Sequence, residues 1–235
     1  IDQKIDHYYF TNMLSKFLDP NQIVSTGSSG LGIEIFYTFF ETKKNQRIFL
    51  TSGLGAMGYG IPSSIGTCIS NNKKKTILVE SDGSFMFNLQ ELSTIVSYKL
   101  PIKIILLNNQ GYASIRNTHK NYFKSRYVGT GNEDGIKYPN YKNLCKAFNI
   151  QYLCIKNKRE LSNNLKKNLL SKSSSIIEVI LKKDEVLKPK VGAVLQKNGS
   201  IISMPLEDMT PNLKLGELEK IIKTKLHKNS LILRK

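Results

Sequence analysis

The sequence contains no tryptophan and only three cysteines, Cys68, Cys145 and Cys154, in 235 residues. An odd number of cysteines without a Cys-x-x-Cys spacing indicates neither a disulfide framework nor a zinc site. No apolar run approaches the roughly 20 residues that a membrane-spanning helix requires. The first ten residues also lack the pattern of a secretory signal. We therefore expect a reducing, cytoplasmic environment and no membrane partner.

Acidic residues are also scarce, because 18 Asp and Glu stand against 35 Lys and Arg. The net charge of +17 raises nucleic acid or an anionic surface as a partner. However, the lysines occur in short groups along the whole chain, and Asn and Ile are abundant beside them. This spread favours a biased background composition, so nucleic acid is not expected as a partner. A non-catalytic basic binding module is kept as an alternative.

The length suits one well-cored domain followed by a tail. Lys188-Pro189-Lys190 marks the expected boundary, which gives a domain over residues 1–187 and a tail over residues 188–235. In the tail, Asn198-Gly199 between two apolar runs predicts a hairpin. Glu217–Lys225 predicts a short helix, and the basic end that follows is expected to be loose.

Short β-branched runs alternate with segments of helical periodicity. The predicted strands are residues 23–26, 47–50, 76–80, 102–107, 151–155 and 175–181, and the predicted helices are residues 2–18, 31–40, 57–70, 88–99, 141–148 and 158–170. This alternation predicts an α/β fold with a doubly wound parallel sheet and helices on both faces. Residues 114–138 break the pattern and suggest a mobile cover over a ligand site. Their basic residues, Arg116 among them, could meet a substrate carboxylate, but each one is expected to be solvated.

Polar turns follow two of the predicted strands. Residues 76–80 end at Ser81-Asp82-Gly83-Ser84, and residues 102–107 end at Asn108-Asn109-Gln110-Gly111. A strand, a crossover helix and a second strand form a parallel unit, so both turns lie at the carboxyl edge of the sheet. Open α/β sheets bind ligands at that edge. Asp82 and Asn109 can therefore converge.

These turns offer hard oxygen ligands. One carboxylate, one amide oxygen and a carbonyl from a glycine turn suit Mg²⁺, which takes its remaining ligands from water and a bound phosphate. The backbone N–H groups of Gly83 and Ser84 could bind that phosphate. An isolated Asp-Gly-Ser is usually an N-cap and turn, so the pair of turns, and neither alone, indicates a metal site.

The pattern of Asp82-Gly83-Ser84, about two dozen residues of helix and strand, and Asn108-Asn109-Gln110-Gly111-Tyr112 resembles the signature of thiamine-diphosphate-dependent enzymes. Upstream, the segment Ser52-Gly53-Leu54-Gly55-Ala56-Met57-Gly58-Tyr59-Gly60-Ile61-Pro62 is similar to the glycine-rich segment of the acetolactate synthase branch. Together the two regions cover residues 21–181 as the diphosphate-binding (PP) domain of that family. Ser81 stands where the family usually has Gly, and its Cβ is expected to alter the turn.

The resemblance implies roles for four loops. The implied cofactor-binding residues are Gly27, Ser28, Ser29, Gly55, Met57, Asp82, Gly83, Ser84, Asn109, Gly111 and Tyr112, and the implied Mg²⁺ ligands are Asp82, Asn109 and the carbonyl of Gly111. In the family, the Gly55 counterpart binds the aminopyrimidine of thiamine diphosphate, and the Met57 counterpart wedges between the two rings. Taken alone, Met57 would be core filler, and Ser28 would be an ordinary N-cap.

No catalytic residue is expected in this chain. In the family, a glutamate from a separate pyrimidine-binding (Pyr) domain activates the cofactor, and no second βαβ set supplies that domain here. Glu80 and Glu91 are expected to make solvent or capping contacts. Because the sequence starts at Ile1, we expect a piece of a longer polypeptide that carries the Pyr domain, or else one subunit of a split enzyme. A homodimer or homotetramer is expected, and the chain alone is expected to be inactive.

The resemblance implies a carboligase or decarboxylase, that is, a transferase or lyase. Such an enzyme decarboxylates a 2-oxo acid, pyruvate in acetolactate synthase, and transfers the two-carbon unit to a carbonyl acceptor. The acceptor is left open between a second pyruvate, an aldehyde and a keto sugar. A subunit of a split decarboxylase of the phosphonopyruvate or sulfopyruvate type is the alternative.

Overall fold

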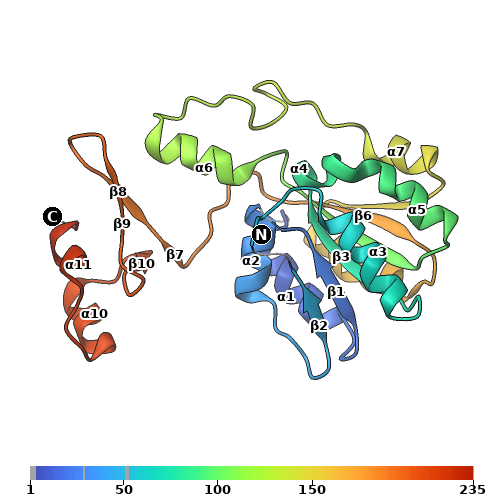
Figure 1. Cartoon of the computed structure of the whole chain (residues 1–235), viewed down its shortest axis with the longest axis horizontal. Coiled ribbons are helices and arrows are strands. Elements are labelled where there is room, and N and C mark those ends of the chain that lie inside the picture. Colours follow the sequence, from blue (N-terminus) through green and yellow to red (C-terminus); the bar gives the residue numbers. More distant parts are fainter. Residues whose placement is uncertain (1–3, 29, 51–52, 235) are drawn as a thin grey trace. The chain divides into compact units, whose positions relative to one another are not determined.

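The computed structural model describes residues 4–28, 30–50 and 53–234 (Figure 1). The chain divides into two compact units, Ile1–Glu185 and Val186–Lys235. Ser29 and Ser52, both named from the sequence, lie outside the described residues. In the part of the chain that is described, no helix is both long and apolar enough to cross a membrane.

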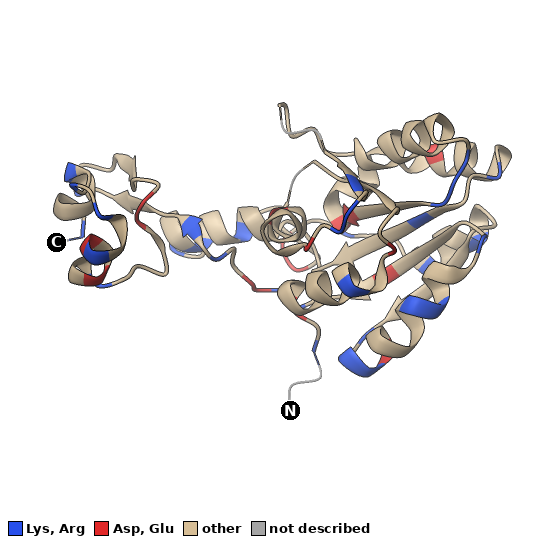
Figure 2. Ribbon diagram, turned by 90° about the horizontal axis from the view of Figure 1, so that it is seen from below, with Lys and Arg blue, Asp and Glu red and all other residues tan. Residues whose placement is uncertain are grey.

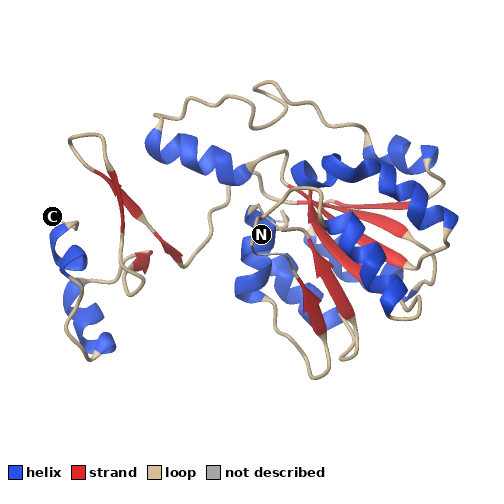
Figure 3. Cartoon of the chain, in the orientation of Figure 1, coloured by secondary structure: helices blue, strands red, loops and turns tan. Residues whose placement is uncertain are grey.

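A six-stranded parallel sheet forms the centre of the first unit (Figure 3). Its strands are β1 (Ile23–Thr26), β2 (Arg47–Phe49), β3 (Thr76–Ser81), β4 (Ile102–Asn108), β5 (Gln151–Ile155) and β6 (Ser175–Ile180), in the order β2-β1-β3-β4-β6-β5. Thr76 pairs with Ile102 and Ser81 with Leu107, so β3 and β4 end at the same edge. The predicted α/β sheet is confirmed.

Helices cover both faces of this sheet because the strands bury apolar side chains on both sides. One face carries α1 (His7–Phe17), α2 (Leu31–Phe39) and the continuous helical segment of α8 (Lys158–Glu160), η2 (Leu161–Leu165) and α9 (Lys166–Leu170); the other carries α3 (Gly60–Ser70), α5 (Leu92–Ser97) and α7 (Tyr141–Ala147). In β4, Ile104 and Leu106 pack on the second face, while Ile105 and Leu107 pack on the first. This alternation follows the two-residue period of a strand.

Three helices of the first unit begin at other residues than predicted, namely α1, α3 and the crossover helix. Helix α3 begins at Gly60 rather than at Met57. Helix α1 begins at His7, because the Asp6 side chain caps it by accepting from the N–H of Tyr9 at 2.7 Å. The crossover begins directly at the polar turn, as α4 (Asp82–Phe85), η1 (Met86–Glu91) and then α5. A kink at Asn88 (φ −140°, ψ 40°) interrupts it, where the Asn88 side chain donates to the carbonyl of Gly58 at 2.8 Å.

The segment after β4 contains a helix that the sequence did not predict. Helix α6 (Ala113–Tyr122) occupies the start of residues 114–138, which were expected to be irregular. Only Ala113 and Arg116 of this helix are buried. An apolar stripe at helical spacing is therefore absent, and periodicity could not indicate the helix.

The second unit is small and ordered. It contains the antiparallel pairs β7 (Lys190–Val191) with β10 (Met209–Thr210) and β8 (Ala193–Leu195) with β9 (Ile201–Ser203), then α10 (Leu215–Ile222) and α11 (Lys228–Ile232). The pair β8–β9 is the predicted hairpin. The prediction of a loose basic end was wrong, because Glu207 accepts from the N–H of His227 at 2.7 Å and from Ser230 at 3.0 Å, and Arg234 pairs with Asp208.

Candidate cofactor site

A hollow of about 220 Å³ lies at the carboxyl edge of the sheet, beyond β3 and β4. Its wall includes Met57, Asp82, Gly83, Ser84, Asn109, Gly111 and Tyr112, all of them named from the sequence. The remaining wall comes from Ser81, from Gly30, Leu31 and Glu34 at the start of α2, and from Ala113, Ser114 and Ile115 at the start of α6. The sequence carried no signal for the α6 residues, because that helix was not predicted.

Asp82 joins the two polar turns. Its side chain is 1% exposed and accepts from the N–H of Gly83 at 2.8 Å and from the N–H of Gly111 at 2.9 Å. Burial raises the pKa of Asp82 to about 6, while these two donors and the nearby Arg116 act in the opposite direction. A buried carboxylate of this kind gains from a cation beside it.

Asn109 lies next to this carboxylate in the wall of the hollow. It is 4% exposed, and its Oδ1 atom has no hydrogen-bond partner among the described residues. An unpaired buried acceptor costs about 1–3 kcal/mol. A cation or a hydrogen-bond donor from outside the described residues would satisfy this oxygen.

The Gly111 turn requires glycine. Its φ is +122°, and a Cβ there would lie 2.1 Å from the carbonyl oxygen of Thr130. The described residues contain no group of three or more His, Cys, Asp and Glu side chains that could hold a metal. A buried carboxylate, an orphaned amide oxygen and a backbone carbonyl instead form a small set of hard oxygen donors, and this set fits Mg²⁺.

One of the two backbone N–H groups expected to bind phosphate makes a contact within the chain, because the N–H of Gly83 donates to Asp82 at 2.8 Å. The hydroxyl of Ser84 accepts from the N–H of Gly58 at 2.9 Å. A Cβ on Gly83 would lie 2.2 Å from the ring of Tyr112, so glycine permits the two turns to pack together. Ser84 therefore connects the polar turn to the glycine-rich loop.

Gly27, Ser28 and Gly55, also predicted from the sequence, are not part of the wall of the hollow. The Ser28 hydroxyl donates to the carbonyl of Ala56, which joins the loop after β1 to the glycine-rich loop. Gly55 adopts φ +60° in that loop. Gly27 donates to the carbonyl of Val79 at 2.8 Å and lies behind the hollow. Met57 reaches the wall and is 43% exposed, so it is not core filler.

Glu80 was predicted wrongly as a solvent or capping contact. Its side chain is fully buried, and its carboxyl group lies between two glycines. A Cβ on Gly27 or on Gly60 would come within 2.1 or 1.9 Å of its oxygens. Burial raises the pKa of Glu80 to about 7. Glu91, in contrast, is half-buried and accepts locally from Thr94 at 3.0 Å, as expected.

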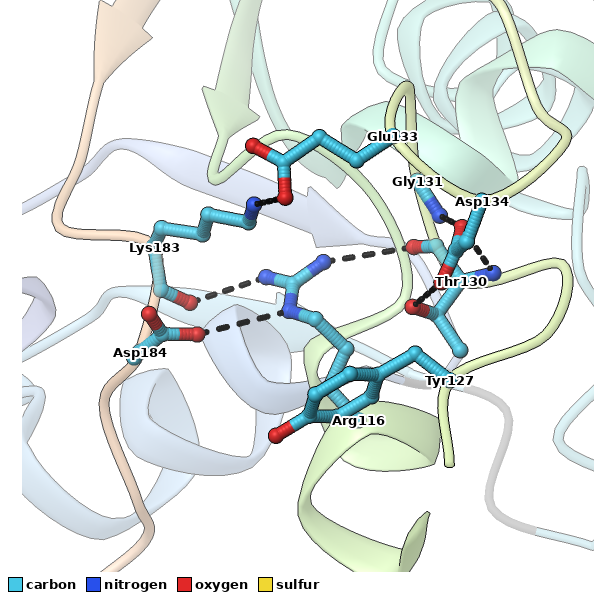
Figure 4. A pocket seen from close by; sticks show the side chains of 8 residues that line it. All are labelled: Arg116, Tyr127, Thr130, Gly131, Glu133, Asp134, Lys183 and Asp184. Carbon is cyan, nitrogen blue, oxygen red and sulfur yellow. Dashed lines mark hydrogen bonds and ion pairs between the residues drawn. The ribbon is translucent and has the colours of Figure 1, made fainter. Parts of the chain in front are cut away.

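Arg116 was also predicted wrongly, as a solvated side chain. It is 6% exposed and donates to four backbone carbonyls, those of Asn109 at 2.9 Å, Gln110 and Thr130 at 3.2 Å, and Lys183 at 2.8 Å. Figure 4 shows it in a separate hollow of about 370 Å³ with its guanidinium directed at Lys183 and Thr130. Through its bonds to these carbonyls, Arg116 therefore stabilises the turn that carries Asn109.

Comparison with known proteins shows which family the chain resembles. The family model described as "Thiamine pyrophosphate enzyme, C-terminal TPP binding domain" matches residues 26–179. The acetolactate synthase large subunit of Porphyra purpurea is 36% identical over 123 residues, which are 52% of this chain and 20% of that protein. Acetolactate synthase 1, chloroplastic, of Zea mays is 28% identical over 195 residues, 81% of this chain and 30% of that protein. The chain thus spans 20–30% of the length of these relatives.

The fold has a counterpart among solved structures. The thiamine diphosphate-dependent 4-hydroxybenzoylformate decarboxylase of Rhodococcus jostii RHA1 is similar with a TM-score of 0.68 and 19% identity, over 79% of this chain and 34% of that chain. The family match runs from the end of β1 to the end of β6 and includes both polar turns and the glycine-rich loop. The chain therefore belongs to the thiamine pyrophosphate enzyme family and carries its C-terminal, thiamine pyrophosphate-binding domain.

Proposed function

We propose that this chain is the cofactor-binding part of an acetolactate synthase-like enzyme that depends on thiamine diphosphate and Mg²⁺. The enzyme would decarboxylate a 2-oxo acid, with pyruvate as the first candidate, and transfer the two-carbon unit to a carbonyl acceptor. The observation that carries this proposal is the meeting of Asp82 with the orphaned Oδ1 of Asn109 in one hollow. The similarity to acetolactate synthases supports the reaction class.

Different residues in and beside the hollow would bind different parts of the cofactor. Asp82, Asn109 and the carbonyl of Gly111 would bind Mg²⁺, and the metal would hold the diphosphate. Met57 would support the two rings from the glycine-rich loop, and the Gly55 carbonyl would orient the aminopyrimidine. When bound, thiamine diphosphate supplies the nucleophilic carbon and the electron sink for decarboxylation.

A catalytic glutamate would come from outside this chain. Glu80 does not line the hollow and is enclosed by Gly27 and Gly60, so it is not available to a cofactor ring. A Pyr domain, on the same polypeptide or on a partner subunit of a homodimer or homotetramer, would supply that group. The chain alone would then be inactive. Native mass spectrometry with identification of the subunits distinguishes the split-decarboxylase alternative, because in a split enzyme the Pyr domain lies on an unlike subunit.

Substitutions in the complete enzyme test the assignment. Asp82→Ala and Asn109→Ala should each abolish Mg²⁺-dependent retention of thiamine diphosphate and the formation of acetolactate from pyruvate, because each removes a metal ligand. Met57→Ala should retain the metal and slow proton exchange at the reactive carbon. Unchanged cofactor content in either of the first two variants would contradict the assignment.

A further inference from the structure

A second hollow with a distinctive charge lies at the opposite, amino-terminal edge of the sheet. Its volume is about 520 Å³, and four of the residues in its wall are lysines: Lys73, Lys75, Lys99 and Lys172. Pro101, Leu170 and Ser171 complete the wall, so among the described residues no Asp or Glu lines it. We call it the lysine hollow.

The fold brings these lysines together from three separate loops. Lys73 and Lys75 precede β3, Lys99 precedes β4, and Lys172 precedes β6. Because β3, β4 and β6 are parallel neighbours in the sheet, the loops that lead into them are adjacent. Lysines are spread over the whole chain (Figure 2), but here three loops direct them to one concave surface.

A fifth lysine lies behind the wall. Lys103 in β4 is fully buried, and its Nζ donates to the hydroxyl of Ser171 and the carbonyl of Ser173. Lys75 donates to the carbonyl of Leu169 at 2.9 Å. Burial and the nearby Lys75 lower the pKa of Lys103 to about 8. Both ammonium groups therefore donate to uncharged acceptors.

Helix ends do not balance this charge. Helices α3, α5 and α9 end at this edge, and a helix C-terminus carries about half a negative charge, so three of them supply about one and a half against five ammonium groups. The hollow at Arg116 is different: there Lys183 pairs with Glu133 at 2.8 Å, and Asp184 lies 3.6 Å from Arg116. Of these two hollows in the described part of the chain, the lysine hollow is the one whose wall keeps a surplus of positive charge within reach of a ligand.

We propose that the lysine hollow is a binding site for a compact phosphate-bearing anion, of the size of a pyrophosphate or nucleoside triphosphate tail. Three loops surround the anion, and the volume lies within the range of small-molecule sites. A concave site of this size favours a small ligand over a nucleic acid duplex. The site is separate from the proposed cofactor site, since the two lie at opposite edges of the sheet.

Calorimetric titration of the full chain with pyrophosphate, in EDTA and at constant ionic strength, tests this proposal. The variant carries Lys73→Gln, Lys99→Gln and Lys172→Gln, three exposed positions where the fold should be kept. A matched control carries Lys142→Gln, Lys146→Gln and Lys156→Gln, also exposed, and Asp82→Ala removes the candidate metal ligand. Wild type should bind one pyrophosphate, and the first variant should weaken binding at least about tenfold, because three partly screened charge contacts are lost.

The control and Asp82→Ala should bind as tightly as wild type. Equal weakening in the lysine-hollow variant and the control would overturn the proposal, because binding would then follow net charge alone. Loss of binding only in Asp82→Ala would assign the anion to the cofactor site and equally overturn it. Tight binding of a DNA duplex without pyrophosphate binding would show a macromolecular surface instead.

Discussion

Glu80 illustrates how single residues shape the candidate site. A carboxyl group is fully buried in β3, two residues before Asp82, and its space exists only because Gly27 and Gly60 lack a Cβ. It thereby packs the loop after β1 and the start of α3 against β3. The Glu80 side chain therefore fills the space between β3, the loop after β1 and the start of α3.

The charge of Glu80 should set part of the pH dependence of stability. Its pKa is raised from the usual 4.5 to about 7, so the folded chain holds this proton more tightly than the unfolded chain. The stabilisation is complete below pH 4.5 and is lost as the pH rises towards 7, and it amounts to on the order of 3 kcal/mol. Glu80→Gln, which has no such titration, should remove this slope in urea unfolding at pH 4.5–8 in EDTA.

The difference between wild type and Glu80→Gln isolates this residue, because Asp82 titrates in both proteins. Glu41→Gln at an exposed position is the control and should follow wild type at every pH. A constant difference between wild type and Glu80→Gln across the whole range would show that the carboxyl group does not carry the shifted pKa.

The requirement for glycine at position 60 should depend on the presence of the Glu80 side chain. Gly60→Ala places a methyl group 1.9 Å from the Glu80 carboxylate, and overpacking of this kind destabilises by about 1–3 kcal/mol. In a Glu80→Ala background the same change should cost at least about 1 kcal/mol less. Gly66→Ala in the same helix meets open space and should stabilise by about 0.5–1 kcal/mol. Thermal unfolding of the four variants checks this, and additive effects of Gly60→Ala and Glu80→Ala would contradict the packing.

The sequence was sufficient to identify the site residues that follow strand ends. It was not sufficient to identify Glu80, which is buried within strand β3. Asp82 and Asn109 were identifiable because a parallel crossover brings their turns to one edge. Glu80 was misjudged because an acid in an apolar strand looks exposed unless the two distant glycines are known to face it. That contact depends on tertiary packing between strand β3, the loop after β1 and the start of α3.

At the scale of elements, Arg116 connects three segments. It is one of two buried residues of α6 and holds the β4 turn, the loop at Thr130 and the chain after β6 through their carbonyl groups. The Gly111–Gly131 bridge and the bond from the N–H of Tyr112 to Thr130 at 2.8 Å strengthen the same junction. The position of the turn that carries Asn109 and Gly111 therefore depends on helix α6, which the sequence did not predict.

Removal of the Arg116 guanidinium should loosen this junction. Arg116→Met removes the guanidinium from four backbone carbonyls, two of them in buried contacts, and should lower the free energy of unfolding by on the order of 3 kcal/mol. Arg116→Lys should recover only part of the loss, because one ammonium group cannot reproduce the planar array of donors. Urea denaturation measures both, with exposed Arg126→Met as a control that should change stability by less than about 0.5 kcal/mol. Equal effects of Arg116→Met and Arg126→Met would contradict the role of the guanidinium.

Elements with an apolar period were predicted well, and elements without one were not. Strands β3 and β4 and helix α2 differ from their predicted bounds by a residue at most. Helix α6 buries little, and the crossover begins at the polar turn and is kinked where Asn88 contacts Gly58. The local pattern of apolar residues predicts neither of these two features.

For the whole molecule, the first unit holds the cofactor hollow and the lysine hollow at opposite edges of one sheet. Both core clusters lie within residues 5–181. The family match over residues 26–179 coincides with this region. The fold was predictable because the alternation of strands and helices is regular along the chain.

The central claim, that Asp82 and Asn109 together hold a metal-bound diphosphate, is tested most directly by titrating thiamine diphosphate into the full chain with calorimetry. Heat of saturable one-to-one binding should appear with Mg²⁺ and be absent with EDTA, and Asn109→Ala should abolish it. Binding that is equally strong with Mg²⁺, with EDTA and in Asn109→Ala would contradict the account.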